Sequence, residues 1–221
     1  MRFGPQQGEV VLAAMPPFEE ANRLRAFFVT LLRALGDHGI GAALPDMPGQ
    51  GESLLPTEKA SLDDWRGAFA AAEEKLTRAG GRVHIAAMRG GALFDGRANC
   101  QSRWHFAPVT GAALVRDMVR AKQAAAREAS EPFDPKSIVG DGPPVELAGN
   151  CISRSMLAEL QGAAPFAGSG LRTLRLDTDT APADRKLLAR PLWRRAEPDN
   201  NPALARELAA DLAQWVRQCA G

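Results

Sequence analysis

The sequence has 221 residues, of which 45% are hydrophobic and 24% charged, and its 27 basic and 26 acidic residues leave a formal net charge of +1. This balance is typical of a globular protein and argues against a nucleic-acid-binding protein, because phosphate contacts need clustered Lys and Arg. No apolar run approaches the roughly 20 residues of a membrane-spanning helix, residues 1–9 lack a signal-peptide core, and three widely spaced cysteines do not suggest a disulfide framework. We therefore expect a cytoplasmic protein that has no membrane span and no nucleic-acid partner.

Strand-like and helix-like segments alternate along the chain. Short apolar runs predict strands over residues 10–14, 40–44, 83–88, 104–107, 145–148, 171–176 and 191–196. Apolar spacing or high Ala content predicts helices over 24–35, between Ser61 and Gly80, from Ala92 onward, and over 111–129, 153–160 and 202–219. Ser61 and Asp64 have the spacing of a capping box, and Ser153 is placed to cap another helix.

This alternation predicts an α/β protein with a mostly parallel, doubly wound sheet, because right-handed crossovers place helices on both faces. Ligands in such sheets bind at the carboxyl ends of the strands. Function is therefore expected in the loops that follow predicted strands, which are residues 16–20, 46–53, 88–91, 177–184 and 194–200.

Three of these loops together resemble the α/β-hydrolase fold. Asp46–Ser53 is similar to the D-x-P-G-x-G-x-S loop that follows an early strand, and Met88–Gly91 lies where the nucleophile elbow belongs. Pro16–Phe18 lies where a loop usually supplies an amide to the oxyanion hole. The resemblance covers nearly the whole chain and implies one domain over residues 1–221, with a reduced cap at about 110–165.

A narrower resemblance is to the second type of exosortase A system-associated hydrolases, α/β-hydrolase-like proteins linked to bacterial exopolysaccharide loci. Pro16–Arg23 resembles their P-P-F-x-E-E-x-N segment with one residue missing, and Asp46–Ser53, Arg89 and residues 191–198 also look similar. The resemblance implies a small anionic ligand or a protein of the exopolysaccharide system as the partner. It leaves open whether the chain forms a homodimer.

The positions that would carry serine-hydrolase catalysis hold other residues. Such an enzyme needs a Ser or Cys at the elbow, activated by a His that an acid orients. The elbow consensus G-x-S-x-G reads Ala87–Gly91 here, with Arg89 in the place of the nucleophile, and a guanidinium cannot attack an acyl carbon. Asp177 or Asp179 can still supply the acid, but no His follows His105. We therefore expect the chain to lack ordinary Ser-His-Asp catalysis.

Arg89 has two interpretations. At the start of a predicted helix, its guanidinium fork and the helix dipole suit a carboxylate or a phosphate, so the former active site would bind an anionic ligand. The residues expected around that ligand are Arg89, Gly90, Phe18, Glu20 and Glu197. The alternative is an internal ion pair of Arg89, for which the candidate partners are Glu19, Glu20, Asp177 and Glu197.

Other chemistry-bearing residues give weaker signals. Ser53 is the candidate for a displaced nucleophile, although it closes a turn-rich loop. Cys100 and Cys151 are either thiol nucleophiles or small buried side chains. His84 and His105, with Cys100, lack the close spacing of metal ligands, so we expect neither a metal nor another cofactor.

Several charged segments have both a functional and a structural interpretation. Glu19–Glu20 is either an acid pair for proton transfer or a complement to the helix dipole. Residues 193–195 form either a ligand platform or a packed Trp with solvated arginines, and the basic stretch 185–195 either engages an acidic partner or stays solvated. The Pro- and Gly-rich segment 131–142 suits an interaction surface.

The sequence thus favours a non-catalytic α/β-hydrolase-like protein of an exosortase or exopolysaccharide system, which binds an anionic small molecule or a partner protein. The alternative is a hydrolase of an acyl ester or thioester. Its nucleophile would be displaced to Ser53 or to a water activated by Arg89, with Asp177 as a candidate acid.

Overall fold

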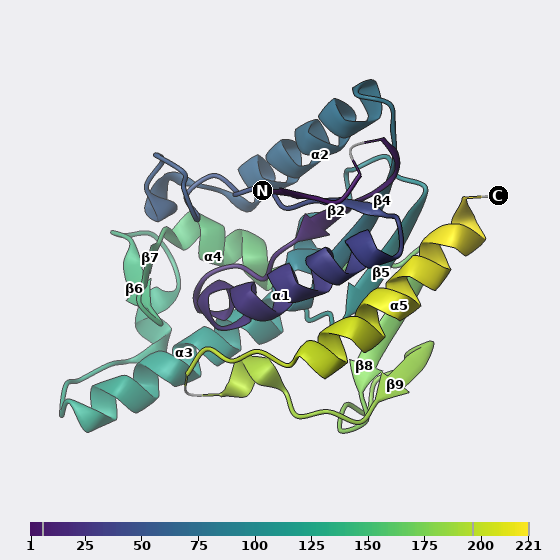
Figure 1. Ribbon diagram of the computed structural model, residues 1–221. Helices are drawn as coiled ribbons and strands as arrows, with labels where there is room; N and C mark the ends of the chain where they lie inside the picture. Colours follow the sequence, from purple (N-terminus) through teal and green to yellow (C-terminus); the bar gives the residue numbers. More distant parts are fainter. Residues whose placement is uncertain (6, 196, 221) are drawn as a thin grey trace.

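A seven-stranded sheet forms the centre of the computed structural model, which describes residues 1–5, 7–195 and 197–220 (Figure 1). The strand order is β1-β3-β2-β4-β5-β8-β9, and every neighbouring pair is parallel except β1 with β3. The prediction of a mostly parallel sheet is confirmed. The strands are β1 (Arg2–Phe3), β2 (Gly8–Ala14), β3 (Gly41–Ala43), β4 (Gly81–Met88), β5 (Ser102–Phe106), β8 (Leu171–Leu176) and β9 (Arg185–Leu187).

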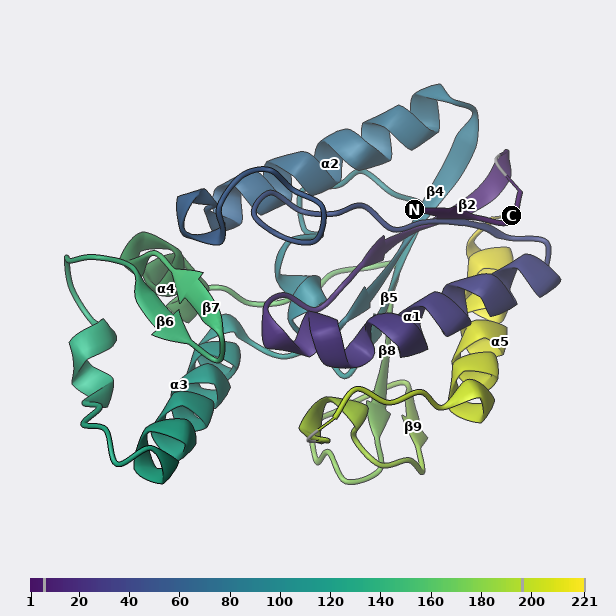
Figure 2. The ribbon, with the colours of Figure 1, turned by 60° about the vertical axis from the view of Figure 1, so that its left-hand side comes forward.

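Helices cover both faces of this sheet. α1 (Glu19–Asp37) and α5 (Pro202–Cys219) pack together on one face, and α2 (Leu62–Arg78) lies on the other (Figure 2). Successive strand residues point to opposite faces. Val11 and Ala13 of β2 therefore join the core beneath α1 and α5, whereas Val10 and Leu12 join the core beneath α2. The unbroken apolar run of β2 is the pattern of a strand buried on both faces.

Side-chain caps fix where several helices begin. Ser61 Oγ accepts a hydrogen bond from Asp64 N at 3.0 Å, and Asp64 accepts one from Ser61 N at 2.9 Å, which is the capping box predicted for α2. Ser153 caps α4 (Arg154–Gln161), as predicted, by accepting a hydrogen bond from Met156 N. Asn201 caps α5 in the same way.

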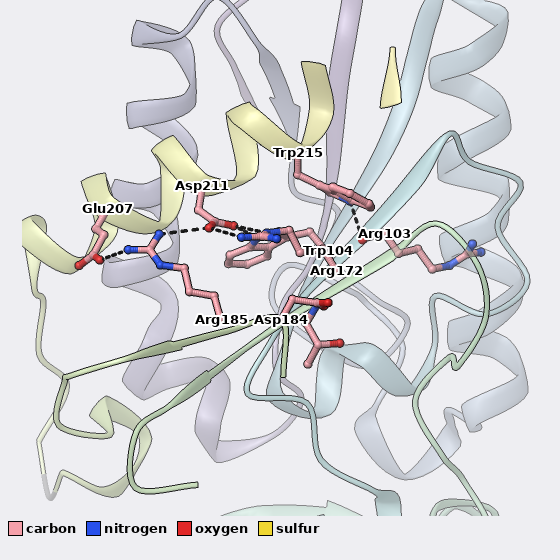
Figure 3. A network of polar contacts seen from close by, with 9 residues as sticks. Arg103, Trp104, Arg172, Asp184, Arg185, Glu207, Asp211 and Trp215 are labelled. Atoms are coloured by element: carbon pink, nitrogen blue, oxygen red, sulfur yellow. Dashed lines mark hydrogen bonds and ion pairs between the residues drawn. The ribbon is translucent and has the colours of Figure 1, made fainter. Parts of the chain in front are cut away.

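A buried carboxylate ties α5 to the sheet. Asp211 accepts hydrogen bonds from Trp104 Nε1 of β5 at 3.0 Å, from Arg172 of β8 at 2.8 Å and from Arg185 of β9 at 3.1 Å (Figure 3). Burial alone would raise the pKa of Asp211, but the hydrogen bonds from Arg172, Trp104 and Arg185 lower it below its ordinary value. One ionised side chain thus holds α5 against three strands.

Between β5 and β8 the chain leaves the sheet. It forms α3 (Gly111–Glu128), η3 (Pro135–Ile138), the hairpin of β6 (Val145–Leu147) and β7 (Asn150–Ile152), and α4, which group together at the left of Figure 1. α3 packs on α4, and β7 contacts η1 (Thr57–Lys59) in the loop after β3. The helices predicted over 111–129 and 153–160 and the strand predicted over 145–148 are confirmed.

The helix predicted from Ala92 onward is wrong. The chain forms instead a short 3-10 helix, η2 (Arg89–Leu93). η2 ends at Leu93, and the buried carboxylate of Asp95, two residues later, lies 2.7 Å from Nε2 of His105 of β5. Gly96 follows, and the chain then continues as turns to β5.

The strand predicted over residues 191–196 is also wrong. Leu192–Arg194 form a 3-10 helix, η4, and Ala196 lies outside the described residues. The last strand is β9, which pairs with the free edge of β8, so that edge is already occupied. β1, β7 and β9 are two or three residues long and leave no periodicity from which to predict them. None of the described helices has the length and apolar character needed to cross a membrane.

Candidate functional site

The turn after β4 has the strained backbone of a nucleophile elbow. Arg89 has a φ of 53°, a conformation that costs a non-glycine residue energy and clusters at functional sites. A Cβ on Gly91 would lie 2.3 Å from Ala14 O, and a Cβ on Gly90 would lie 2.9 Å from Pro17 Cδ. The two glycines therefore let this turn pack against β2 and the loop that follows it.

The loop after β2 contains a second strained residue. Phe18 has a φ of 60°, and its buried ring lies 5.3 Å from the ring of Trp65. The backbone amides of Phe18 and Gly90 occupy the chain positions that form an oxyanion hole in the α/β-hydrolase fold. The turn and the loop of such a site are thus both present, and the strained residue of the turn is Arg89.

Arg89 forms an internal ion pair, the second of the two interpretations that the sequence allows. Its Nη2 and Nε donate to Glu20 Oε1 at 2.7 and 3.1 Å. Only 9% of the Arg89 side chain and 15% of the Glu20 side chain are exposed. Asp117 of α3 lies farther away, 3.9 Å from Arg89 Nη2. Among the four candidate partners, the structure brings Glu20 to Arg89.

Trp193 of η4 covers the other side of Arg89. The guanidinium carbon lies 4.5 Å from the Trp193 ring centroid, within the range of a cation–π interaction. Phe106, at the end of β5, holds Trp193 in an edge-on contact with ring centroids 6.0 Å apart. In this fold the catalytic His comes from the chain that follows the acid. Here that part of the chain places the indole ring of Trp193 against the Arg89 side chain.

A cavity of about 540 Å³ opens beside this ion pair. α1 supplies its charged floor, α3 supplies one wall and η4 supplies another. None of the described residues that line it is a serine, a cysteine or a histidine. The lining residues are Pro17, Phe18, Glu19, Glu20, Arg23, Leu114, Asp117, Met118, Arg120, Ala121, Trp193 and Arg194.

The structure changes the argument for an anion at Arg89. That argument needs a helix whose dipole and free amides face the ligand, but η2 has only five residues, all in 3-10 conformation. Arg89 also has its charge neutralised by Glu20. Of the five residues expected around the ligand, Phe18 and Glu20 line the cavity. Arg89 and Gly90 are buried and are not among the lining residues, and Glu197 is exposed and is not among them either.

Ser53 is engaged within its own loop. Its Oγ accepts hydrogen bonds from Gly49 N at 2.9 Å and from Leu55 N at 3.2 Å. It lines a different cavity, of about 380 Å³, between α1 and the loop after β3. No histidine is among the described residues that line this cavity. The hydroxyl therefore has no base beside it.

The candidate acids after β8 do not reach the elbow cavity. Asp177 is exposed, and its backbone N–H bonds to Leu187 O. Asp179 accepts a hydrogen bond from Arg175 at 2.7 Å. Burial would raise the pKa of Asp179, but the Ala181 N–H and the Arg175 guanidinium lower it. The hydrogen bonds of both aspartates therefore stay within residues 175–187.

Two of the three histidines, His84 and His105, are buried in strands β4 and β5 and do not line the cavity, and His38 follows α1. His84 bonds to Ser102 Oγ at 2.8 Å and to Glu9 Oε2 at 2.7 Å, and His105 bonds to Asp95. In the described part of the chain, no three His, Cys, Asp or Glu side chains are placed to hold a metal ion.

The cysteines do not form a thiolate site beside the elbow. Burial raises the pKa of Cys100 to about 11, so this thiol is a poor nucleophile at neutral pH. Cys151 is exposed on β7. Neither is among the residues that line the elbow cavity.

Sequence reasoning missed the contribution of α3. Leu114, Asp117, Met118 and Ala121 lie three or four residues apart and line the cavity from one helix face. The signal was present as a mixed apolar and acidic face, but nothing in the sequence shows which face turns to the elbow.

The fold is similar to that of several solved hydrolases. Est1E from Butyrivibrio proteoclasticus, solved with bound ferulic acid, has a TM-score of 0.61 and 14% identity, covering 97% of this chain and 90% of that chain. Monoacylglycerol lipase from Paleococcus ferrophilus has a TM-score of 0.55 and 15% identity, covering 99% and 98%. Mouse alpha/beta hydrolase domain-containing protein 10 has a TM-score of 0.55 and 12% identity, covering 99% and 93%.

These similarities concern structure alone. A scan of protein-family models and a search of curated proteins find no match to the sequence. The mostly parallel sheet, the elbow after β4 and the structural neighbours together show an α/β-hydrolase-like fold.

Proposed function

We propose that this α/β-hydrolase-like protein binds a small anionic molecule in the elbow cavity and does not hydrolyse it. The observation that carries the proposal is the Arg89–Glu20 ion pair at the place of the nucleophile. A guanidinium has no lone pair available for attack. Trp193, rather than a base, lies against it. The cavity lies beside the turn and loop that would form an oxyanion hole, but no serine, cysteine or histidine is among the described residues that line it.

The anion would bind at the mouth of the cavity rather than at Arg89. Arg120 lies 3.9 Å from Asp117 and is 69% exposed on its side chain, and Arg194 is an exposed residue with no ion-pair partner among the described residues. Arg23, in contrast, is paired with Glu19. Arg120 and Arg194 come from different elements, α3 and η4, and line one cavity. Two such guanidinium groups suit a carboxylate or a phosphate.

The finer expectations belong to the same proposal. Segment 110–165 would act as a reduced cap, since α3 supplies one wall of the cavity. The association with an exosortase or exopolysaccharide system, and the cytoplasmic location, rest on the sequence reasoning and on the resemblance of Pro16–Arg23 and residues 191–198. A protein partner from such a system remains the other form that binding would take.

Calorimetric titration with hexanoate and with inorganic phosphate tests the proposal. Binding of either probe should weaken at least about tenfold when Arg120 and Arg194 are both changed to Gln. Arg190→Gln is the matched control, because Arg190 is an exposed arginine of the same loop region outside the cavity. The proposal fails if the folded protein binds neither probe, or if Arg190→Gln weakens binding as much as the double change.

Ester or thioester hydrolysis with a displaced nucleophile is the alternative. It is favoured by the likeness of the fold to an esterase and a lipase. Ser53 is the candidate, and its two backbone hydrogen bonds count against it. Turnover of short-chain p-nitrophenyl esters that Ser53→Ala abolishes and Arg89→Ala leaves intact would establish this alternative and remove the binding proposal.

A further inference from the structure

We infer, on the basis of the proposed function, that the ligand carries a neutral hydrogen-bond donor, a hydroxyl group, at the end opposite its anionic group. Only one of the two carboxylate oxygens of Glu20 accepts hydrogen bonds from the described residues. Both donors of Arg89 converge on Oε1, while Oε2 is buried and has no hydrogen-bond partner among the described residues.

An acceptor of this kind is unusual in a folded protein. An ionised carboxylate has about four lone-pair sites, and buried polar atoms nearly always find a partner. Glu20 lines the cavity and keeps 15% of its side chain exposed. Oε2 itself is sealed from solvent, so a ligand would reach it through a rotation of the carboxylate, which the broad minimum of the terminal Glu torsion allows.

The charge balance at the floor of the cavity selects a neutral donor. Glu20 is compensated by Arg89, and Glu19 is compensated by Arg23. Asp117, the third carboxylate of the lining, lies 3.9 Å from Arg89 Nη2 and 3.9 Å from Arg120 Nη1. An ammonium group would therefore add a positive charge beside carboxylates that already face arginines, and a second anion would meet three carboxylates. A hydroxyl group donates one hydrogen bond without changing this balance.

The wall between floor and mouth is largely apolar. Leu114, Met118 and Ala121 of α3 face the cavity together with Trp193 of η4. Burial distinguishes the two ends: Glu20 is 15% exposed on its side chain, Leu114 and Met118 are buried, and Arg120 and Arg194 are exposed. We therefore take Glu20 as the inner end of the cavity and the two arginines as its outer end, with the apolar side chains between them. This order fits a hydroxylated carboxylic acid or phosphate ester with a short apolar chain between its two polar ends.

Matched pairs of probes test the donor separately from the anion. We would titrate the protein by calorimetry with 4-hydroxybutyrate, 6-hydroxyhexanoate and 8-hydroxyoctanoate, each beside the unsubstituted acid of the same length. At the length that fits, the hydroxy acid should bind about tenfold more tightly, as expected for a hydrogen bond to a charged acceptor. The methoxy analogue of that acid, which accepts but cannot donate, should lose this gain.

A variant then assigns the acceptor. Glu20→Gln replaces one carboxylate oxygen by an amide N–H₂, so the preference for the hydroxy over the methoxy analogue should disappear. Circular dichroism first establishes that the variant is folded. Glu19→Gln, at the neighbouring position of α1, should keep the preference. Loss of the preference in both variants would overturn the assignment to Glu20.

The outcomes separate the two proposals. Equal binding of the hydroxy, methoxy and unsubstituted acids overturns the donor while leaving the anion site in place. Tighter binding of 6-aminohexanoate than of 6-hydroxyhexanoate overturns the neutral character of the donor. Absence of binding by every acid in the folded wild-type protein overturns the proposed function, and this inference with it.

Discussion

Trp193 lies over the guanidinium of Arg89, with the guanidinium carbon 4.5 Å from the ring centroid. The two residues come from the parts of the chain that, in an α/β-hydrolase, supply the histidine and the nucleophile. Here they join Glu20 in a cation–π and ion-pair cluster. The cluster uses the strained elbow to hold a charged side chain instead of exposing a reactive one.

The Arg89–Glu20 pair should be energetically coupled. Arg89→Met and Glu20→Gln should each lower the free energy of unfolding by about 2–4 kcal/mol, because each leaves a buried charge without its partner. The double variant should regain about 1–3 kcal/mol relative to the sum of the two changes. Urea unfolding of the four proteins measures this coupling, and strictly additive effects would show that the pair contributes nothing.

Gly91 should tolerate no side chain. Gly91→Ala places a Cβ 2.3 Å from Ala14 O, so backbone must shift, and we expect a loss of about 2 kcal/mol or more in the free energy of unfolding. Gly67→Ala is the matched control, because Gly67 is at an exposed position of α2 and a new Cβ there meets no atom within 4 Å. It should stabilise the protein by about 0.5–1 kcal/mol. Thermal or urea unfolding that ranks the two variants in the reverse order would contradict the packing described for the elbow.

Asp211 should contribute more to the free energy of unfolding at neutral pH than at acidic pH. Asp211→Asn should lower the free energy of unfolding by about 2–3 kcal/mol at pH 7, because Trp104, Arg172 and Arg185 all donate to this buried carboxylate (Figure 3). Its pKa is depressed in the folded state, so its contribution is complete above about pH 4 and is lost as the pH falls further. The difference from the wild type should therefore shrink as the pH falls below about 4.

Glu207→Gln provides the control for Asp211. Glu207 is 47% exposed on its side chain and pairs with Arg185 at the surface. Its replacement should change the free energy of unfolding by about 0.5 kcal/mol or less. An effect as large as that of Asp211→Asn would show that the surface pair, rather than the buried carboxylate, anchors α5.

His84 should make stability fall on mild acidification. Burial lowers the pKa of His84, and the hydrogen bond and charge of Glu9 only partly raise it again. The unfolded chain therefore binds the proton more readily, so the free energy of unfolding should decrease as the pH falls through about 6.5. Urea midpoints at pH 7.5 and 5.5 should differ less in His84→Gln than in the wild type. If the midpoints at the two pH values differ as much in His84→Gln as in the wild type, the prediction is wrong. His38→Gln is the control, because His38 lies outside the sheet.

The long elements could be predicted because their patterns are local. The apolar face of α1, the capping box of α2 and the buried run of β2 each depend on residues close in sequence. The turn after β4 could be predicted as well, because two adjacent glycines, Gly90 and Gly91, follow the apolar strand after a single residue. These features were enough to predict the sheet, and the resemblance of the loops to the α/β-hydrolase fold indicated where the elbow lies.

The contents of the site depend on contacts between distant segments. Glu20 is 69 positions from Arg89, and four acidic residues were equally good partners by sequence. Leu192–Arg194 look like the start of a strand until β9 is known to occupy the sheet edge. The cavity face of α3 likewise depends on how the helix is rotated. Tertiary packing, which no local pattern encodes, decides these points.

Labelling with a fluorophosphonate probe, read by intact-protein mass spectrometry, tests the central claim most directly. Such a probe reacts with an activated serine and requires no knowledge of the substrate. If Arg89 and Glu20 have replaced the catalytic apparatus, the folded protein should keep its unmodified mass during prolonged exposure, while a serine esterase in the same sample is fully labelled. A stoichiometric adduct that maps to Ser53, and disappears in Ser53→Ala, would show that the nucleophile has moved and that the protein is a hydrolase.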